Sequence, residues 1–213
     1  MAKEGREGRQ DRKAARQAAA DRSRRRNAWL RRGIVVVLVL GAAAMAYSFY
    51  SNRQLLDAVA TTSYPAGLHA TGAISYKENP PMGGTHNAIW QNCGVYEVPI
   101  HNEHAVHSME HGAVWITYRP DLPADQIQSL KAIASDDFML LSPYPGLASP
   151  VIVSAWNHQI ALSGAADPKL QAFISQYKNN PQTTPEFGAS CSGGTSAPAS
   201  VDSLSRTPIG LPQ

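Results

Sequence analysis

The segment from His104 to His111 concentrates the side chains of this chain that are best suited to binding chemistry. Three histidines, His104, His107 and His111, and one carboxylate, Glu110, lie in this short run, and an uncharged apolar run follows at 113–118. Histidines four residues apart share one face of a helical turn, a spacing that can chelate a metal ion. Imidazole ligands suit copper and zinc alike. The pattern therefore predicts a transition-metal site.

A second, more distant segment could complete this site. Residues 79–86 contain two prolines followed by two glycines and end at His86. Proline stiffens such a loop, and glycine lets the backbone approach other atoms closely. We therefore expect this loop to position His86 beside His107 and His111, with His69 or Glu110 completing or orienting the metal site.

Two other interpretations of these residues stay open. The first is structural: His107, Glu110 and His111 form a hydrogen-bond network that ties the loop to the edge of a strand. The second is a zinc-dependent hydrolase, because His107 to His111 fits H-x-x-E-H, in which Glu110 would be the general base. Against the hydrolase, Gly112 follows at once where a long helix is needed. A third ligand would have to be Glu186, in a Pro-rich segment.

The remaining histidines and the methionines contribute less to the predicted site. We expect His101, His104 and His158 to be exposed to solvent rather than liganding. Met82 and Met109 would favour Cu(I) if they faced the histidines, but single methionines more often fill cores. No serine has the context of a nucleophile elbow.

The charge of the chain is divided unevenly. Residues 1–32 hold twelve Lys and Arg against four Asp and Glu, whereas the remainder holds seven against twelve. The first tract has almost no large apolar residue before Trp29, so it cannot offset its ordering entropy. We expect residues 1–32 to be a disordered cytoplasmic tail, with no nucleic-acid partner.

An uncharged apolar run at 33–50 follows the basic tract. Its length of about 18 residues is near the lower limit for a membrane-spanning helix. Arginines precede it directly, which places the N-terminus in the cytoplasm and the rest outside. We expect a single-pass anchor at 33–52 and a linker at 53–66. Cleavage of a signal peptide after Ala46 is the alternative, and either process exports the same domain.

Export gives meaning to the two cysteines, Cys93 and Cys191. Two cysteines in an oxidising compartment favour a disulfide, which would close a loop of about a hundred residues and contribute about 4–5 kcal/mol. The alternative is that Cys93 is a thiolate ligand near the histidines.

The pattern of the exported part predicts one small α+β domain over 67–192. We expect a mainly antiparallel sheet with two helices against one face. The helices are predicted at 123–134 and from Pro168 with Asp167 as cap. Val106 to Glu110 could add a single helical turn. A disordered tail is predicted over 193–213. The strands are predicted after Gly94 and at 113–118, 138–141, 151–156 and 159–162, with a weak candidate at 69–76.

Several segments in this order resemble the bacterial membrane-anchored family called domain of unknown function 3105, which is common in actinobacteria. The resemblance covers roughly residues 64–194. It implies an N-terminal anchor and an exported domain, with no established reaction. The positions that match the family's histidine and glutamate pattern are His69, His86, His107, Glu110 and His111. Met109 stands where similar proteins are expected to have Leu. The motifs that carry the resemblance are His69, Tyr76, Pro80-Pro81-x-Gly83-Gly84-x-His86, Gly94-Val95-Tyr96, Val106-His107-Ser108-Met109-Glu110-His111-Gly112, Tyr118-Arg119-Pro120, Leu141-Ser142-Pro143-Tyr144 and Pro185-Glu186-x-x-x-x-Cys191.

Taken together, the sequence predicts a membrane-anchored, extracytoplasmic domain that binds Cu or Zn, in metal handling or as a structural site. The rival interpretation is a non-catalytic domain that binds other proteins of the cell envelope and whose histidines are structural.

Overall fold

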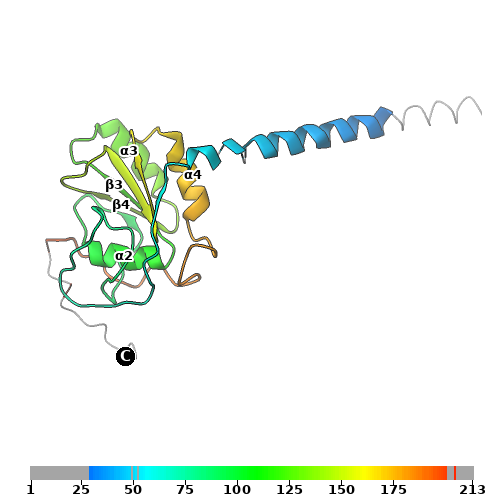
Figure 1. Cartoon of the computed structure of the whole chain (residues 1–213). Helices are drawn as coiled ribbons and strands as arrows, with labels where there is room; N and C mark the ends of the chain where they lie inside the picture. The colour runs from blue at the N-terminus through cyan, green and yellow to red at the C-terminus, as the bar shows by residue number, and fades with distance from the viewer. Residues whose placement is uncertain (1–28, 49, 52, 201–203, 205–213) are drawn as a thin grey trace, which may run out of the picture. The chain divides into compact units, whose positions relative to one another are not determined.

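A computed structural model describes residues 29–48, 50–51, 53–200 and 204. Residues 1–28 of the predicted basic tail at 1–32, and most of the predicted C-terminal tail at 193–213, lie outside the described residues. Residues 29–32 are helical. The chain divides into two compact units, Met1–Ser51 and Asn52–Gln213, and the second holds the sheet (Figure 1).

The first unit contains most of an apolar helix that runs from Trp29 to Leu55, 27 residues in all. The mean hydropathy of its most apolar window is 2.0, and none of that window is buried. By length and composition this helix can cross a membrane, and a signal sequence would share these properties. The structure is therefore compatible with the predicted single-pass anchor.

The second unit is built on a six-stranded sheet with the order β1-β6-β5-β3-β4-β2. Its α+β class agrees with the prediction. The strands are β1 (Ala60–Thr61), β2 (Gly94–Val95), β3 (Val114–Tyr118), β4 (Met139–Pro143), β5 (Val151–Ala155) and β6 (His158–Leu162).

The sheet is mixed, so the prediction of a mainly antiparallel sheet was wrong. β3 and β5, β5 and β6, and β1 and β6 are antiparallel, whereas β4 runs parallel to both β3 and β2. For the pair β3 and β4, the cause is the helix α3 (Ala124–Ile133) between these two strands. A helix in that connection returns the chain to the end where β3 began, so the next strand runs in the same direction.

The two predicted helices cover one face of the sheet. Because successive side chains of a strand point to opposite faces, Val114, Ile116 and Tyr118 of β3 all enter one core, which also contains Leu130 of α3 and Phe173 of α4 (Pro168–Tyr177). α4 begins as predicted, with Asp167 capping the amide of Lys169 and Pro168 in its first turn. α3 begins at Ala124, one residue later than predicted, with Pro123 as its N-cap residue.

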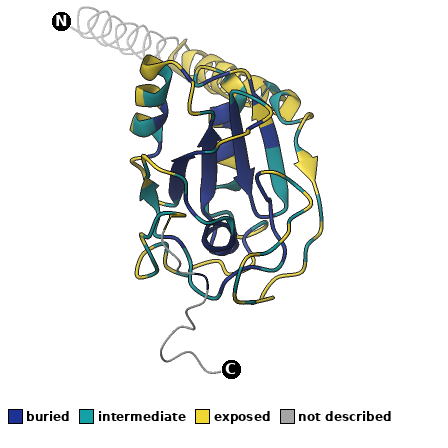
Figure 2. Ribbon diagram, turned by 90° about the vertical axis from the view of Figure 1, so that its left-hand side faces the viewer, coloured by how far each residue is buried: buried dark blue, intermediate teal, exposed yellow. Residues whose placement is uncertain are grey.

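A third helix, α2 (Asn102–Glu110), packs on the opposite face, where only a single turn was predicted. Its Val106 and Met109 join Trp115 and Leu140 in a second core. Every residue from Glu103 to Glu110 is buried, because loops cover the side of the helix that faces away from the sheet (Figure 2). α2 is therefore a polar helix held inside the domain.

The segment after Gly193, for which the composition predicts disorder, makes backbone contacts with the domain where it is described. Thr195 pairs with Gln91, and the amide of Ala199 donates to the carbonyl of Pro99. The side chain of Asn87 donates to the carbonyl of Leu204. This segment thus borders the loop that carries His86.

Gly112 connects α2 to β3 in a conformation that strongly favours glycine. Its φ is +103°, and an added Cβ would lie 3.0 Å from the Cα of Asn179. We predict that Gly112→Ala lowers the free energy of unfolding by about 2 kcal/mol or more, from the left-handed backbone and the overpacking together. Chemical denaturation of the full chain in detergent measures this loss.

Gly146→Ala is the matched control, because its φ is +79° but an added Cβ would meet nothing within 4 Å. An equal loss of stability in both variants would mean that the contact with Asn179 does not matter.

Candidate metal centre

Helix α2 supplies the central part of the candidate site. His107 and Glu110 lie one turn apart at its C-terminal end, and His111 is its C-cap residue. These three side chains share one side of the helix because they are three and four residues apart. The helix ends here because Gly112 turns the chain into β3.

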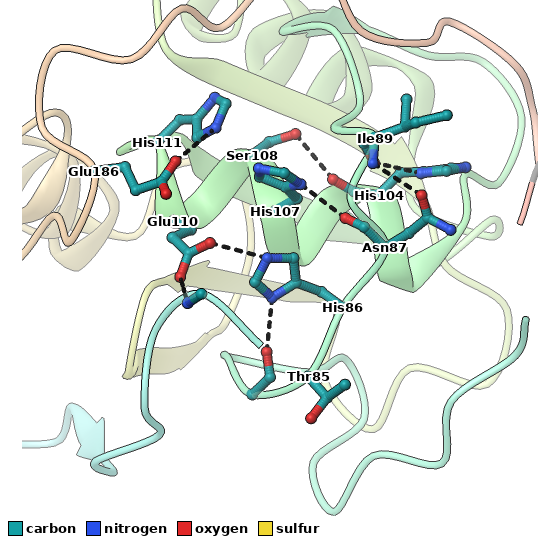
Figure 3. A network of polar contacts seen from close by, with 12 residues as sticks. Thr85, His86, Asn87, Ile89, His104, His107, Ser108, Glu110, His111 and Glu186 are labelled. Atoms are coloured by element: carbon teal, nitrogen blue, oxygen red, sulfur yellow. Dashed lines mark hydrogen bonds and ion pairs between the residues drawn. The ribbon is translucent and has the colours of Figure 1, made fainter. Parts of the chain in front are cut away.

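The Pro-Pro-Gly-Gly loop brings His86 against this side of α2. The chain after the loop follows the helix, where the amides of Asn87 and Gln91 donate to the carbonyls of Glu103 and His104. The hydroxyl of Ser108 donates to the carbonyl of Gln91. These contacts hold the loop at a defined position along α2, together with the hydrogen bonds from His107 to Asn87 and from His104 to Ile89 that Figure 3 shows.

His69 lies beside His86 through a parallel β-bridge. The amide of Ala70 donates to the carbonyl of His86, and the amide of His86 donates to the carbonyl of Leu68. The His69 ring lies 4.9 Å from the His86 ring and 5.0 Å from the His107 ring, centroid to centroid. Backbone hydrogen bonds thus place a residue from each of two loops next to the helix.

His69, His86, His107 and Glu110 form one group that could hold a metal ion, which we call the inner group. One ligand atom from each lies within 4.8 Å of the others. His69 is exposed, and the other three are buried. His107, His111 and Glu186 form a second such group, the outer group, in which Glu186 is exposed. The two groups share His107.

Three of the histidines in the two groups are oriented in the same way, by a hydrogen bond from Nδ1 to a backbone carbonyl. The Nδ1 atoms of His86, His107 and His111 lie 2.7–2.8 Å from the carbonyl oxygens of Gly84, Asn87 and Ser190. A carbonyl oxygen only accepts, so each Nδ1 carries a proton and donates. In the neutral ring the Nε2 lone pair is then free to bind a cation. Metal-ligating histidines are commonly oriented by such a hydrogen bond.

The contact between His86 and Glu110 needs a positive charge. The Nε2 of His86 lies 2.9 Å from Oε2 of Glu110, and both side chains are fully buried. The other oxygen of Glu110 accepts a hydrogen bond from the amide of Gly67. If His86 were neutral, two acceptors would face each other without water, which is costly. A proton on Nε2 or a bound cation removes this conflict.

His111 and Glu186 repeat this arrangement nearer the surface. The Nε2 of His111 lies 3.2 Å from Oε2 of Glu186, whose side chain is 44% exposed. The backbone of Glu186 is also fixed, because its amide donates to the carbonyl of Glu110. The indole ring of Trp90 lies against the rings of both His107 and His111.

The electrostatics of the inner group favour neutral imidazole at His107. Burial, together with the neighbouring His86 and His111, lowers the pKa of His107 from 6.5 to about 3. Burial and the nearby His86 also lower the pKa of His69. Burial acts to raise the pKa of Glu110, but its contacts with His86 and the Gly67 amide outweigh burial and lower it. Neutral imidazole and ionised carboxylate are the forms that bind metals.

The five residues predicted as metal ligands all lie at this end of α2. Four of them form the inner group, whereas His111 lies in the outer group with His107. His104 is fully buried, so the expectation that it is exposed was wrong. Its Nδ1 donates to the carbonyl of Ile89, which fixes the loop along the helix. Met109 packs in the core beside Trp115. It therefore acts as core filler and does not support binding of Cu(I).

Glu186 was considered in the sequence only as a hydrolase ligand and was discounted because its segment is Pro-rich. A signal for it did exist. Glu186 precedes Cys191 by five residues, and pairing of Cys191 with Cys93 carries it toward the histidine cluster. The structure joins these cysteines, whose Cα atoms are 5.4 Å apart, a separation that suits a disulfide. Cys93 and Cys191 thus form a pair that is suited to a disulfide, which favours this interpretation of Cys93 over a thiolate ligand.

For the hydrolase interpretation, the structure brings together the three possible zinc ligands but does not place Glu110 as a general base beside them. His107, His111 and Glu186 do converge. Glu110, however, accepts from the Gly67 amide and contacts His86, so its carboxylate is directed into the inner group. We therefore do not propose hydrolysis.

The low pKa of His107 makes the stability of the metal-free domain depend on pH. Between about pH 6.5 and pH 3, the unfolded state binds a proton at this residue and the native state does not. The contribution of His107 to the free energy of unfolding is therefore fully present above about pH 6.5 and is lost as the pH is lowered toward 3. We predict a smaller fall in His107→Asn, whose amide can still donate to Asn87. Denaturation of the chelator-treated chain across this range measures both profiles, and identical profiles would contradict the assignment.

Comparison with known proteins identifies the family to which the chain belongs. The family model described as "Protein of unknown function (DUF3105)" matches residues 69–193, more than half of the 213-residue chain. The match contains both the inner and the outer groups and both cysteines. No curated protein and no solved structure matches the chain. The chain therefore belongs to the DUF3105 family, as the order of its histidine and glycine motifs predicts.

Proposed function

We propose that this protein is a membrane-anchored, extracytoplasmic domain that binds one copper or zinc ion through the inner group, His69, His86, His107 and Glu110. The ion serves in metal handling at the cell envelope or as a structural site. His111, which was grouped with these ligands from the sequence, contributes from the neighbouring outer group.

The contact between His86 and Glu110 is the observation that carries this proposal. Both atoms are acceptors in their ordinary states, both are buried, and they lie 2.9 Å apart. Within the described residues, each of these two atoms has only the other as a polar partner. Two buried acceptors in contact are costly unless a proton or a cation lies between them. A divalent cation would satisfy both atoms together.

The spacing of the inner group suits a first-row transition metal. Bonds of about 2.0–2.1 Å to nitrogen or oxygen in a tetrahedral site place the donor atoms about 3.3 Å apart. The 2.9 Å contact is close to this value, and no donor in the group is further than 4.8 Å from another. His69 is the exposed member, so its rotation can close the remaining distance without disturbing the core.

The chemistry of the donors narrows the choice of ion. Three imidazoles and one carboxylate suit Zn²⁺ and Cu²⁺, whereas Mg²⁺ and Ca²⁺ prefer oxygen ligands. Because Met109 packs in the core, its thioether does not support a Cu(I) site beside the histidines.

The extracytoplasmic location is supported by two features. The helix Trp29–Leu55 has the length and composition of a membrane span, and arginines precede it, as is typical of a cytoplasmic N-terminus. The Cys93–Cys191 pair suits an oxidising compartment.

The cysteine pair gives a direct prediction. Thiol titration of unreduced, unfolded protein should find no free thiol, because Cys93 and Cys191 form a disulfide. Two free thiols would contradict the disulfide and would restore Cys93 as a candidate thiolate ligand.

The rival function is an envelope interaction domain with structural histidines. In that case a proton shared between His86 and Glu110 satisfies the buried contact, and no metal is needed. The two accounts differ in whether a metal can displace the proton.

Metal uptake separates these accounts. We predict that the full chain in detergent, first treated with a chelator, takes up one equivalent of Zn²⁺ and releases protons as it does so. Calorimetry in buffers of different ionisation enthalpy measures both quantities. His86→Gln and His107→Gln should each weaken binding by about tenfold to a hundredfold or more, as losses within metal sites do.

His158→Gln is the matched control. His158 has the same kind of Nδ1 hydrogen bond, to the carbonyl of Trp156, but belongs to neither group. Binding that is equally weak in all three variants, or absent from the unaltered chain, would contradict the proposal and favour the structural interpretation.

A further inference from the structure

The outer group lies next to the inner group and shares a ligand with it. His107 belongs to both, and its Nδ1 is already occupied by the carbonyl of Asn87. Only Nε2 is left to bind a cation, so His107 can serve one ion at a time. The ring of His107 lies 4.8 Å from that of His86 and 4.6 Å from that of His111. The shared histidine thus stands between two similar half-sites.

The two half-sites differ in access to solvent. His86 and Glu110 are fully buried. Glu186 is 44% exposed, and its negative charge is available to an ion arriving from outside. The Glu186 amide donates to the carbonyl of Glu110, and the His111 ring donates through Nδ1 to the carbonyl of Ser190. These two hydrogen bonds fix the outer group to the same helix end.

We propose that the outer group is a second metal position, where His107, His111 and Glu186 capture the ion before it moves to the inner group. During the move the bond to His107 is kept. The bonds to His111 and Glu186 break while bonds to His86 and Glu110 form. The ion keeps its oxidation state, and the proton that is displaced from the inner pair passes to solvent. This inference rests on the proposed function of the inner group.

The chain contains a natural reporter for each position. The Trp90 ring lies 4.9 Å from the His111 ring and 5.7 Å from the His107 ring. The Trp156 ring lies 5.7 Å from the His86 ring. Cu²⁺ quenches indole fluorescence most strongly at short range. Trp90 lies against His111 and the shared His107, so its signal responds as soon as the outer position fills, whereas the Trp156 signal responds when the ion reaches His86. Trp90→Phe and Trp156→Phe variants of the full chain separate the two signals.

The experiment mixes the metal-free full chain in detergent rapidly with Cu²⁺ and follows fluorescence. We expect the Trp90 signal to fall before the Trp156 signal. Glu186→Gln should still bind one equivalent at equilibrium but fill the inner position about tenfold more slowly, because it loses a ligand and an attracting charge. His86→Gln should quench Trp90 and leave Trp156 largely unquenched, because the ion stops at the outer position.

Glu97→Gln is the control for charge alone, because Glu97 is an exposed carboxylate that pairs with Lys131 outside both groups. If Glu186→Gln and Glu97→Gln fill the inner position at the same rate, the outer position is overturned and the proposed function stands. Two equivalents bound at once to the unaltered chain would also overturn the sharing of His107. No binding by the unaltered chain would instead overturn the proposed function itself.

Discussion

The buried contact between the imidazole of His86 and the carboxylate of Glu110 is the constraint around which this domain is built. Each group is costly to bury alone, and the pair is stable only when a proton or a metal ion lies between the two side chains. Several backbone contacts hold the two side chains in this position. The carbonyl of Gly84 orients one partner and the amide of Gly67 holds the other, while the β-bridge from His69 fixes the loop backbone.

The same requirement explains the unusual helix α2. A helix at the edge of a small domain normally exposes its polar side, yet α2 is buried from Glu103 to Glu110. Loops drawn from distant parts of the chain cover it: the segment after the Pro-Pro-Gly-Gly loop, the segment that carries Glu186, and the stretch around Thr195. Carbonyl oxygens of the first two of these segments accept hydrogen bonds from the histidine rings. The sheet anchors the apolar side of the helix through Trp115 and Leu140, so the polar side is presented in a fixed orientation.

Features of the fold that depend on local sequence could be predicted, and those that depend on distant partners could not. The apolar run of β3 and the start of α4 at Asp167 and Pro168 are encoded locally. The full length of α2 was missed because its polar residues show no amphipathic pattern until the covering loops are known. The parallel pairing of β3 and β4 arises from the path of α3. For the candidate site, the histidines that lie together could be predicted, but their division into two groups and the position of Glu186 beside His111 required the fold.

The most direct test of a metal between these side chains is X-ray absorption spectroscopy of the full chain loaded with one equivalent of Zn²⁺. The account predicts a first coordination sphere of nitrogen and oxygen at about 2.0–2.1 Å, with the outer-sphere scattering of about three imidazole rings, and fewer rings in His86→Gln. A spectrum of oxygen ligands alone, without imidazole scattering and unchanged in His86→Gln, would contradict it.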